Sequence, residues 1–232
     1  MAEALRRTVV QVSRDRRSGD IEAAARDVFC ERGFDAASTA EIAARAGVAE
    51  GTLYKYFQNK RALLIKVLAS WYQSMLSDFA SQLEAVQGTR NKVYYIISRH
   101  LHSLKDNAEL ARLSYHEVRH SGDYYESEIY SFNREYTQVL VTTLREGINK
   151  GELRESLPVS LVRDLIFGGI DHLISGFLFN QRPLDIKKSA EELVTLIFEG
   201  VAASEMSEKS LDKVLHRFDL VADRMEEALA KK

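Results

Sequence analysis

The chain of 232 residues is 45% hydrophobic and 28% charged, a composition typical of a folded globular protein that excludes an intrinsically disordered chain. Its 32 basic and 34 acidic side chains give a formal net charge of −2, which also excludes a uniformly basic nucleic-acid coat protein. The chain has only two prolines, Pro158 and Pro183, and one cysteine, Cys30, so we expect long helices, an all-α fold and no internal disulfide.

Features of a secreted or membrane protein are absent from the sequence. The N-terminus lacks the apolar stretch of a signal peptide, and no run reaches the roughly 18–20 apolar residues of a membrane span. We therefore expect a soluble, cytoplasmic protein with no membrane partner, and nothing in the composition calls for a cofactor.

Charge is distributed unevenly along the chain. Residues 1–17 carry five arginines against two acidic residues, residues 1–61 have a net charge of +2, and residues 62–232 have −4. This pattern favours a small anion-binding head on a larger acidic body, although an ordinary solvated tail would give the same arm.

The first predicted helix follows the basic arm. Apolar residues recur at helical spacing from Ile21 to Phe29, and Gly33 can take the left-handed conformation that ends a helix. We therefore expect this helix to begin near Ile21 and to end before Gly33.

Two short helices separated by a tight turn follow. Ser38 or Thr39 can cap the first, Gly47 ends it, and a second is predicted from about Glu50 to Phe57. Two short helices joined in this way are typical of a helix-turn-helix, and a plain helical hairpin with solvated polar residues is the alternative. The predicted DNA contacts are Arg16, Arg17, Thr39, Glu50, Gly51, Thr52, Tyr54, Lys55, Tyr56 and Lys60.

The head resembles the tetracycline-repressor (TetR) family of bacterial regulators over about residues 16–68. The matching segments read IEAAARDVFCERGFDAAS and TAEIAARAGVAEGTLYKYFQNKRALL. The resemblance implies a homodimer on a palindromic operator and a C-terminal domain that senses a small molecule. Two departures are the acidic Glu50, which repels phosphate unless it accepts a bond from cytosine, and Asp20 in place of an aliphatic residue.

The resemblance and the charge pattern together define four regions. We expect a basic arm over 1–15, a three-helix helix-turn-helix DNA-binding domain over 16–61, and a larger helical ligand-sensing and dimerisation domain over 62–204. An additional amphipathic helix is predicted over 205–232. Within the larger domain, helices are expected at about 60–86, 90–105, 108–120, 123–150, 159–180 and 186–203.

Inward-facing residues of the larger domain are candidates for a ligand pocket. Most could equally be ordinary core, because a pocket for an apolar ligand is cut from the same residue types. The polar candidates could bind a carboxylate, a thioester carbonyl or a phosphate. The predicted ligand-binding residues are Trp71, Met75, Tyr94, Ile97, His100, Leu101, Leu104, Arg112, Leu113, His116, Arg119, Tyr136 and Leu140.

The segment from His116 to His120 matches the zinc-protease pattern HExxH. It lacks the flanking apolar run, and no third ligand stands at a known spacing, so we expect no metal site and keep a zinc hydrolase as a remote alternative. Residues 108–203 also resemble the sensor domains of TetR-family regulators of fatty-acid degradation, which bind long-chain acyl-CoA. Glu117 and Arg119 match their E-x-R pair, and Ile166 to Asp171 match a second element.

Two apolar stripes near the C-terminus are assigned by the resemblance to a four-helix dimer interface, and core within one chain is the alternative. The predicted interface residues are Ile166, Phe167, Ile170, Ile174, Phe177, Leu193, Leu196 and Ile197.

These observations predict a dimeric transcriptional repressor and not an enzyme. We expect it to bind operator DNA and to be released by a hydrophobic effector, with a long-chain acyl-CoA as the first candidate. The alternative effector is an aromatic or drug-like compound.

Overall fold

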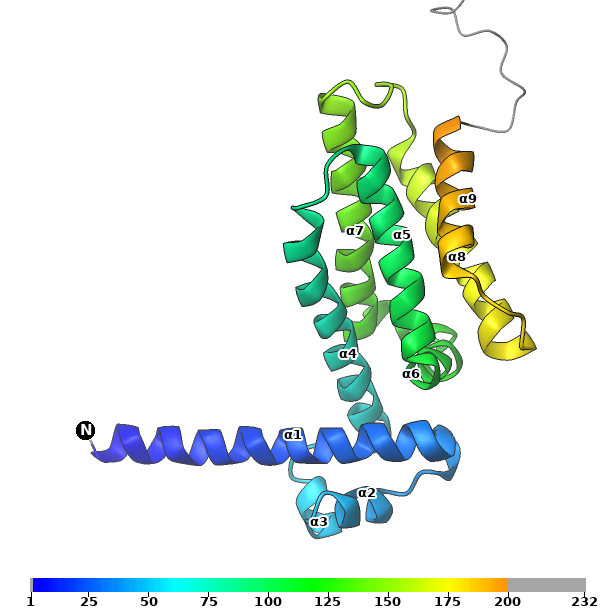
Figure 1. Cartoon of the computed structure of the whole chain (residues 1–232). Helices are drawn as coiled ribbons and strands as arrows, with labels where there is room; N and C mark the ends of the chain where they lie inside the picture. The colour runs from blue at the N-terminus through cyan, green and yellow to red at the C-terminus, as the bar shows by residue number, and fades with distance from the viewer. Residues whose placement is uncertain (1, 200–232) are drawn as a thin grey trace, which may run out of the picture. The chain divides into compact units, whose positions relative to one another are not determined.

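The computed structural model describes the backbone of residues 2–199 and, within that range, the side chains of residues 14–77 and 82–199. These residues form helices and no strand, which confirms the predicted all-α class (Figure 1). The predicted helix over 205–232 lies outside the described residues. The elements are α1 (Ala2–Ala36), α2 (Thr39–Arg45), α3 (Glu50–Leu53), α4 (Lys60–Leu83), α5 (Thr89–Asp106), α6 (Ala108–Leu113), the π-helical η1 (Ser114–Arg119), the short 3-10 helix η2 (Tyr124–Glu126), α7 (Glu128–Asn149), α8 (Val159–Asn180) and α9 (Ile186–Glu199).

Helix α1 is much longer than predicted. It begins at Ala2, so the predicted start near Ile21 is wrong, and the basic arm is part of the helix. No proline interrupts residues 2–32, and the single Gly19 costs only about 1 kcal/mol of helix stability. Gly33 leaves the helical conformation, with φ 77° and ψ 172°, as predicted.

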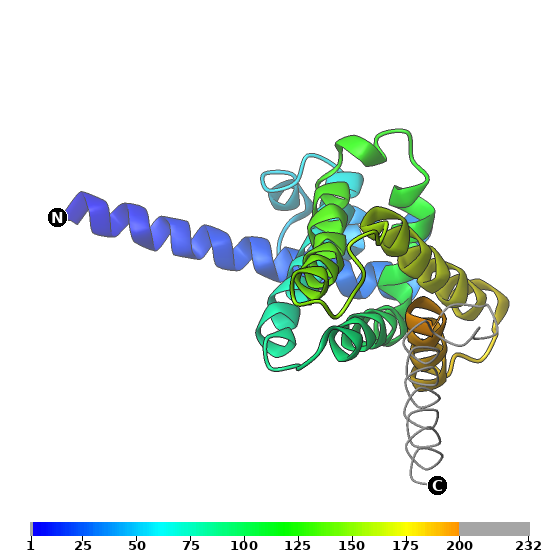
Figure 2. The same cartoon turned by 90° about the horizontal axis from the view of Figure 1, so that it is seen from above.

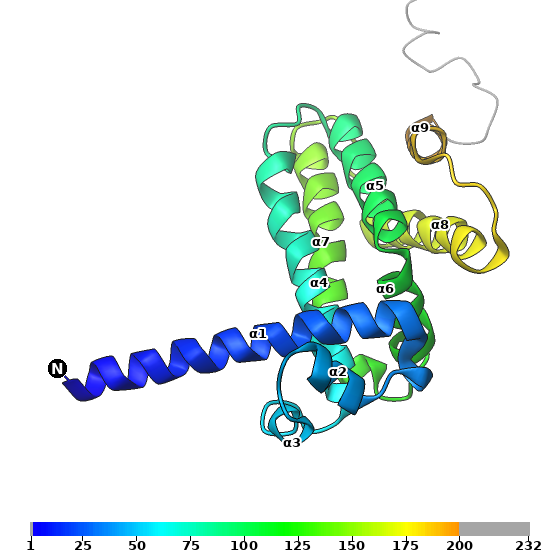
Figure 3. The same ribbon diagram turned by 60° about the horizontal axis from the view of Figure 1, so that its bottom comes forward.

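The head is a three-helix unit in which α2 packs on α1 and α3 packs on α2 (Figure 3). The Ser38 hydroxyl accepts a bond from the Glu41 amide, so Ser38 caps α2. Helix α3 ends at Leu53, and the predicted extension to Phe57 is wrong because residues 54–56 form a turn. Leu53 and Phe57 are both buried, so the turn still directs the expected apolar side chains inward.

Four longer helices form the body. Helix α7 packs against α4, α5 and α8, and α8 also contacts α5 (Figure 2). Each buried leucine or isoleucine there stabilises the fold by about 1.5–3 kcal/mol. Fully buried examples are Leu64, Leu68, Ile97, Leu101, Leu140, Leu144, Ile166 and Ile170. The chain divides after Val194 into two compact units, and the first contains the head and these four helices.

A close approach of α5 and α7 requires glycine at one position. A Cβ on Gly147 would lie 2.6 Å from Thr89 Oγ1. The Thr89 amide donates to Glu152 Oε2 at 2.7 Å, which caps the start of α5 and lowers the pKa of Glu152. The end of α7 and the start of α5 are thereby held together.

The predicted helix over 108–120 changes its geometry halfway. Residues 108–113 are α-helical, whereas Ser114–Arg119 form a π-helix. Short π-helical segments are rare and are enriched at functional sites. None of the helices in the described residues is long and apolar enough to span a membrane.

Candidate functional site

The outer face of the head carries a hydrogen-bonded cluster that joins α2 to α3. Thr39 Oγ1 donates to Glu50 Oε1 at 2.6 Å, and the Tyr54 hydroxyl lies 3.0 Å from the same Thr39 oxygen. Because the Thr39 hydroxyl has one proton, Tyr54 is the donor in the second bond. Tyr54 is 49% exposed. Three predicted DNA contacts thus lie together on a solvent-facing surface.

Other predicted contacts are also accessible. The Arg14 guanidinium lies 5.9 Å from the centre of the Tyr56 ring, a cation–π contact that ties α1 to the turn after α3. The remaining predicted contacts, which are exposed or half-buried, are Arg16, Arg17, Gly51, Thr52, Lys55 and Tyr56.

Lys60 has a structural role that its sequence position did not predict. Its ammonium donates to the carbonyl oxygens of Phe34, Asp35 and Ala37 at 2.7, 3.2 and 2.9 Å, and it lies 4.6 Å from the centre of the Phe34 ring. These bonds satisfy carbonyls at the end of α1 and use all three ammonium protons. A phosphate contact from Lys60 would have to break one of them.

Arg61 connects the start of α4 to the π-helix. Its guanidinium donates to the Glu117 carbonyl at 2.9 Å, to Ser121 Oγ at 3.0 Å and to Asp123 Oδ1 at 2.8 Å. Bonds from Ser121 and Arg61 lower the pKa of Asp123. Since α4 directly follows the head, this residue joins the head to the π-helix of the body.

The two histidines of the HExxH match contact different residues. The His116 ring packs edge-on against Phe179 at 4.9 Å, and His120 Nδ1 lies 2.7 Å from the Tyr115 carbonyl oxygen. Across the described part of the chain, no group of three histidine, cysteine, aspartate or glutamate side chains could hold a metal ion.

The π-helix is also joined to α8 by an ion pair. The Arg119 guanidinium donates to both Asp171 oxygens at 3.1 Å, and the Tyr115 hydroxyl donates to Asp171 Oδ1 at 2.5 Å. Burial and the adjacent Asp171 carboxylate raise the pKa of Tyr115, so its hydroxyl remains a donor. Arg119 of the predicted E-x-R pair therefore bonds Asp171 of the second matched element.

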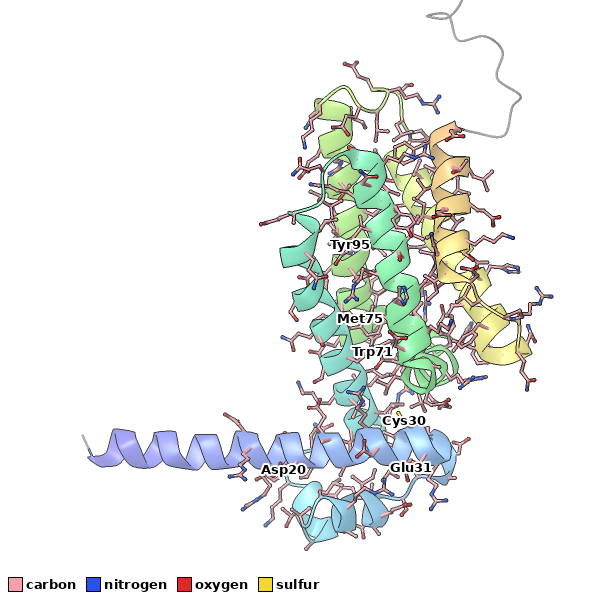
Figure 4. The ribbon with its side chains drawn as sticks, viewed as in Figure 1. Asp20, Cys30, Glu31, Trp71, Met75 and Tyr95 are labelled. Atoms are coloured by element: carbon pink, nitrogen blue, oxygen red, sulfur yellow. The ribbon has the colours of Figure 1, made fainter. Side chains whose placement is uncertain are left out.

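A cavity of about 450 Å³ lies between α1, α4 and α5, a volume in the range of small-molecule sites. Trp71 and Met75 project from α4 beside α5 (Figure 4). The Trp71 ring is 6% exposed and its Nε1–H is buried without a hydrogen-bond partner. The lining residues are Gly19, Glu22, Ala23, Arg26, Val67, Ser70, Trp71, Ser74, Met75, Arg99, Ser103, Asp106, Asn107 and Tyr136.

The structure distributes the other predicted ligand residues among several places. Ile97, Leu101 and Leu140 are fully buried core and line none of the hollows described here, so their assignment to a pocket is not supported. Tyr94 is half-buried. Arg112, Leu113 and His116 line a separate hollow of about 330 Å³ beside the end of α1, and His100, Leu104 and Arg119 line one of about 40 Å³.

His100 is a buried, neutral side chain. Its ring lies 4.9 Å from that of Tyr136 and 5.4 Å from that of Phe167, and Nδ1 has no hydrogen-bond partner. Burial lowers the pKa of His100 to about 4. The imidazole is therefore an uncharged polar group inside the body at neutral pH.

Sequence reasoning missed the charged side of the large cavity. Gly19, Glu22, Ala23 and Arg26 lie on the face of α1 opposite its buried stripe, and all four line the cavity. Their spacing is visible in the sequence, but nothing there shows that this face meets α5 and not solvent. Arg99 was missed for the same reason.

The predicted dimer interface is partly wrong. Ile166, Ile170 and Ile174 are completely buried within one chain, so they are intrachain core. Phe167 packs on His100, and Phe177, Leu193 and Ile197 are half-buried. The strongly exposed apolar residues of the region are Leu161, Leu165, Phe179 and Leu196.

Comparisons with known proteins cover most of the chain. A model described as bacterial regulatory proteins, tetR family, matches residues 21–67, and one described as YsiA-like protein, C-terminal region, matches residues 71–200. The fatty acid metabolism regulator protein of Bacillus subtilis (strain 168) is 30% identical over 178 residues, which cover 77% of this chain and 92% of that protein.

Solved structures share the fold. The transcriptional regulator FadR from Bacillus subtilis in complex with stearoyl-CoA aligns with a TM-score of 0.70 and 30% identity, over 79% of this chain and 98% of that one. The fatty acid degradation regulator FadR from Bacillus halodurans aligns with a TM-score of 0.69 and 27% identity, over 79% of this chain and 99% of that one.

Proposed function

Because the chain belongs to the TetR family of bacterial transcriptional regulators, with relatives that regulate fatty acid metabolism, we propose that it is a dimeric repressor controlled by long-chain acyl-CoA. It binds a palindromic operator through paired heads and leaves DNA when acyl-CoA enters the sensor. The observation that carries this proposal is the cavity of about 450 Å³ in a chain whose 30%-identical relative was solved with stearoyl-CoA.

The cavity suits a ligand with one apolar and one polar end. Val67, Trp71 and Met75 supply apolar surface, whereas Arg26 and Arg99 supply positive charge. An acyl chain favours the first environment and phosphate groups favour the second. An aromatic drug would use the apolar wall but would leave the arginines unpaired.

The head has the groups that an operator contact requires. Tyr54 and Lys55 are exposed in the turn that follows α3, and Arg16 and Arg17 extend the positive surface along α1. Tyr54 and Glu50 are held by Thr39, so their positions are set before binding. Charged side chains such as Lys55 contact phosphate, and short side chains at α3 reach base edges.

Release requires that the effector favour one of two arrangements of head and body. Arg61 supplies a route, because its bonds to Glu117, Ser121 and Asp123 fix the start of α4 on the π-helix. A change in the π-helix would therefore move the helix that follows the head.

Dimer formation would bury an apolar face of α8. Leu161 and Leu165 are 55% and 56% exposed, four residues apart on one side of the helix. Exposed leucines at helical spacing are typical of a helix that packs against a second copy.

Selection of randomised duplex DNA on the purified protein, followed by gel shifts with palmitoyl-CoA, tests the proposal. We expect a palindromic site, and palmitoyl-CoA should both release it and raise the melting temperature. Palmitate and free coenzyme A are the matched partial ligands. If neither they nor palmitoyl-CoA releases DNA and an aromatic dye does, the acyl-CoA assignment is wrong.

A further inference from the structure

The large cavity has one wall that belongs to the DNA-binding head. Glu22, Ala23 and Arg26 face it from α1, on the side opposite Ile21 and Val28, which are fully buried in the head. Trp71 on α4 and Arg99 on α5 face it from the body. A molecule in the cavity therefore touches both parts of the protein at once.

One hydrogen bond crosses the same cavity from head to body. Arg26 donates to Asn107 Oδ1 at 3.1 Å, and both residues line the cavity. Asn107 lies between α5 and α6, and its own side-chain amide donates to the Ser103 carbonyl at 3.0 Å. Asn107 is thus positioned by the body, while Arg26 moves with the head.

Two further donors, on Trp71 and Arg99, line this cavity. The Trp71 Nε1–H is buried and makes no hydrogen bond. The half-buried Arg99 guanidinium also faces this cavity. Buried donors in native structures are almost always satisfied, so the Trp71 Nε1–H calls for an acceptor on the ligand.

The acidic residues of the lining restrict the ligand further. Glu22 and Asp106 lie in the same cavity as Arg26 and Arg99. A simple anion would meet two carboxylates, whereas a ligand that combines phosphates with N–H donors pairs with both kinds of side chain. Coenzyme A has a diphosphate, two amides and an adenine amino group.

We propose that the phosphate-bearing end of the effector lies in this cavity and takes Arg26 from Asn107, so that the ligand bonds the head directly. This inference rests on the proposed acyl-CoA function and adds the place and the residues through which the ligand acts on the head. Arg99 and Arg26 bind phosphate from opposite walls, and the Trp71 Nε1–H donates to a ligand oxygen. The ligand therefore fixes α1 against α5 in a geometry different from that set by the Arg26–Asn107 bond.

Calorimetric titration of the full chain with palmitoyl-CoA tests this exchange of partners. The variants are Arg26→Gln, which removes the guanidinium charge, and Asn107→Ala, which removes the acceptor of the Arg26 bond. Arg26→Gln should weaken palmitoyl-CoA binding by roughly tenfold, the usual loss for one charge-assisted hydrogen bond. Asn107→Ala should tighten palmitoyl-CoA binding, because it frees Arg26 for the ligand.

Arg99→Gln should weaken palmitoyl-CoA binding by a similar factor. Arg145→Gln is the matched control, because Arg145 is exposed on α7 and lies outside the cavity lining. Palmitate, which has no phosphate, should bind wild type and Arg26→Gln equally. Melting curves without ligand show that each variant is folded.

Unchanged palmitoyl-CoA affinity in Arg26→Gln overturns the inference and leaves the proposed function standing. Equal losses in Arg26→Gln and Asn107→Ala also overturn it, since they show that the bond persists in the liganded protein. If wild type does not bind palmitoyl-CoA at all, the proposed function fails and the inference fails with it.

Discussion

The head and the body differ in whether their polar side chains have hydrogen-bond partners within the chain. In the head, the Lys60 ammonium and the Thr39 hydroxyl each have partners in the free protein. In the body, Trp71 Nε1 and His100 Nδ1 are buried without one, and no buried side-chain nitrogen or oxygen among the head's described residues shares that condition. These polar groups of the head are therefore paired within the chain, whereas the body retains buried polar atoms without a partner.

The largest expected effect comes from substitutions in the core of the head and in the core of the body. Leu53 in the head and Leu140 in the body are both fully buried, so Leu53→Ala and Leu140→Ala should each lower the free energy of unfolding by about 2–5 kcal/mol. Leu53→Ala should abolish operator binding and retain palmitoyl-CoA binding, because the cavity lining does not include Leu53. Denaturant unfolding with gel shifts and calorimetry measures all three quantities.

Leu140→Ala tests the same separation from the other side. It should leave operator binding intact at low temperature, where the variant remains folded, because Leu140 lies in the core of the body and not in the head. Equal loss of both activities in both variants would show that head and body cannot be distinguished energetically.

The free energy of unfolding should depend on pH by about 3 kcal/mol through His100, a residue of the body. Burial lowers the pKa of His100 to about 4 from an ordinary value near 6.5, so the unfolded chain binds the proton more tightly than the folded one. The stabilising contribution is therefore complete above pH 6.5 and is lost as pH falls from about 6.5 to 4. Arg119 also lowers this pKa and Asp171 raises it.

Urea unfolding of wild type and His100→Leu at several pH values measures this effect. The difference between the two proteins should change by about 3 kcal/mol over that window. A constant difference would mean that His100 is not held neutral by burial.

Lysine variants should sharpen the distinction between a scaffold contact and a DNA contact within the head. Lys60→Met removes three bonds to carbonyls at the end of α1 and should cost about 1–3 kcal/mol of stability as well as operator affinity. Lys55→Met is the matched control, because Lys55 is exposed and outside these bonds. It should weaken operator binding and its salt dependence without changing the melting temperature. Equal melting temperatures for both variants would show that Lys60 does not cap α1.

The smallest expected effect concerns the unpartnered indole. Trp71→Phe removes the buried Nε1–H, so stability should change by less than about 1 kcal/mol, because no bond is lost. Palmitoyl-CoA affinity should nevertheless fall by about three- to tenfold, as one ligand bond disappears. A large loss of stability with unchanged ligand affinity would mean that the indole serves the core alone.

The fold of the head could be predicted because its signals are local. Ser38 caps α2, Asn59 Oδ1 accepts from the Ala62 amide at the start of α4, and Gly33 has the expected positive φ. Each of these depends on residues within four positions. The extended start of α1 was missed because the charged residues were interpreted as a basic arm that precedes the first helix.

The body could be predicted only as helices. Ile166, Ile170 and Ile174 form a stripe that specifies a buried face but not whether the same chain or a second chain covers it. The bonding partners of the π-helix, Arg61 and Asp171, are distant from it in sequence. For the same reason, no local pattern could predict a cavity formed by α1, α4 and α5.

Linkage between the two ligands tests the central claim most directly. Palmitoyl-CoA affinity of wild type should be measured without DNA and with saturating operator, alongside operator affinity with and without palmitoyl-CoA. If effector and operator favour different states, each weakens the other by the same factor, typically about 5- to 150-fold. Equal palmitoyl-CoA affinity in the presence and absence of operator would contradict a regulator that acyl-CoA releases from DNA.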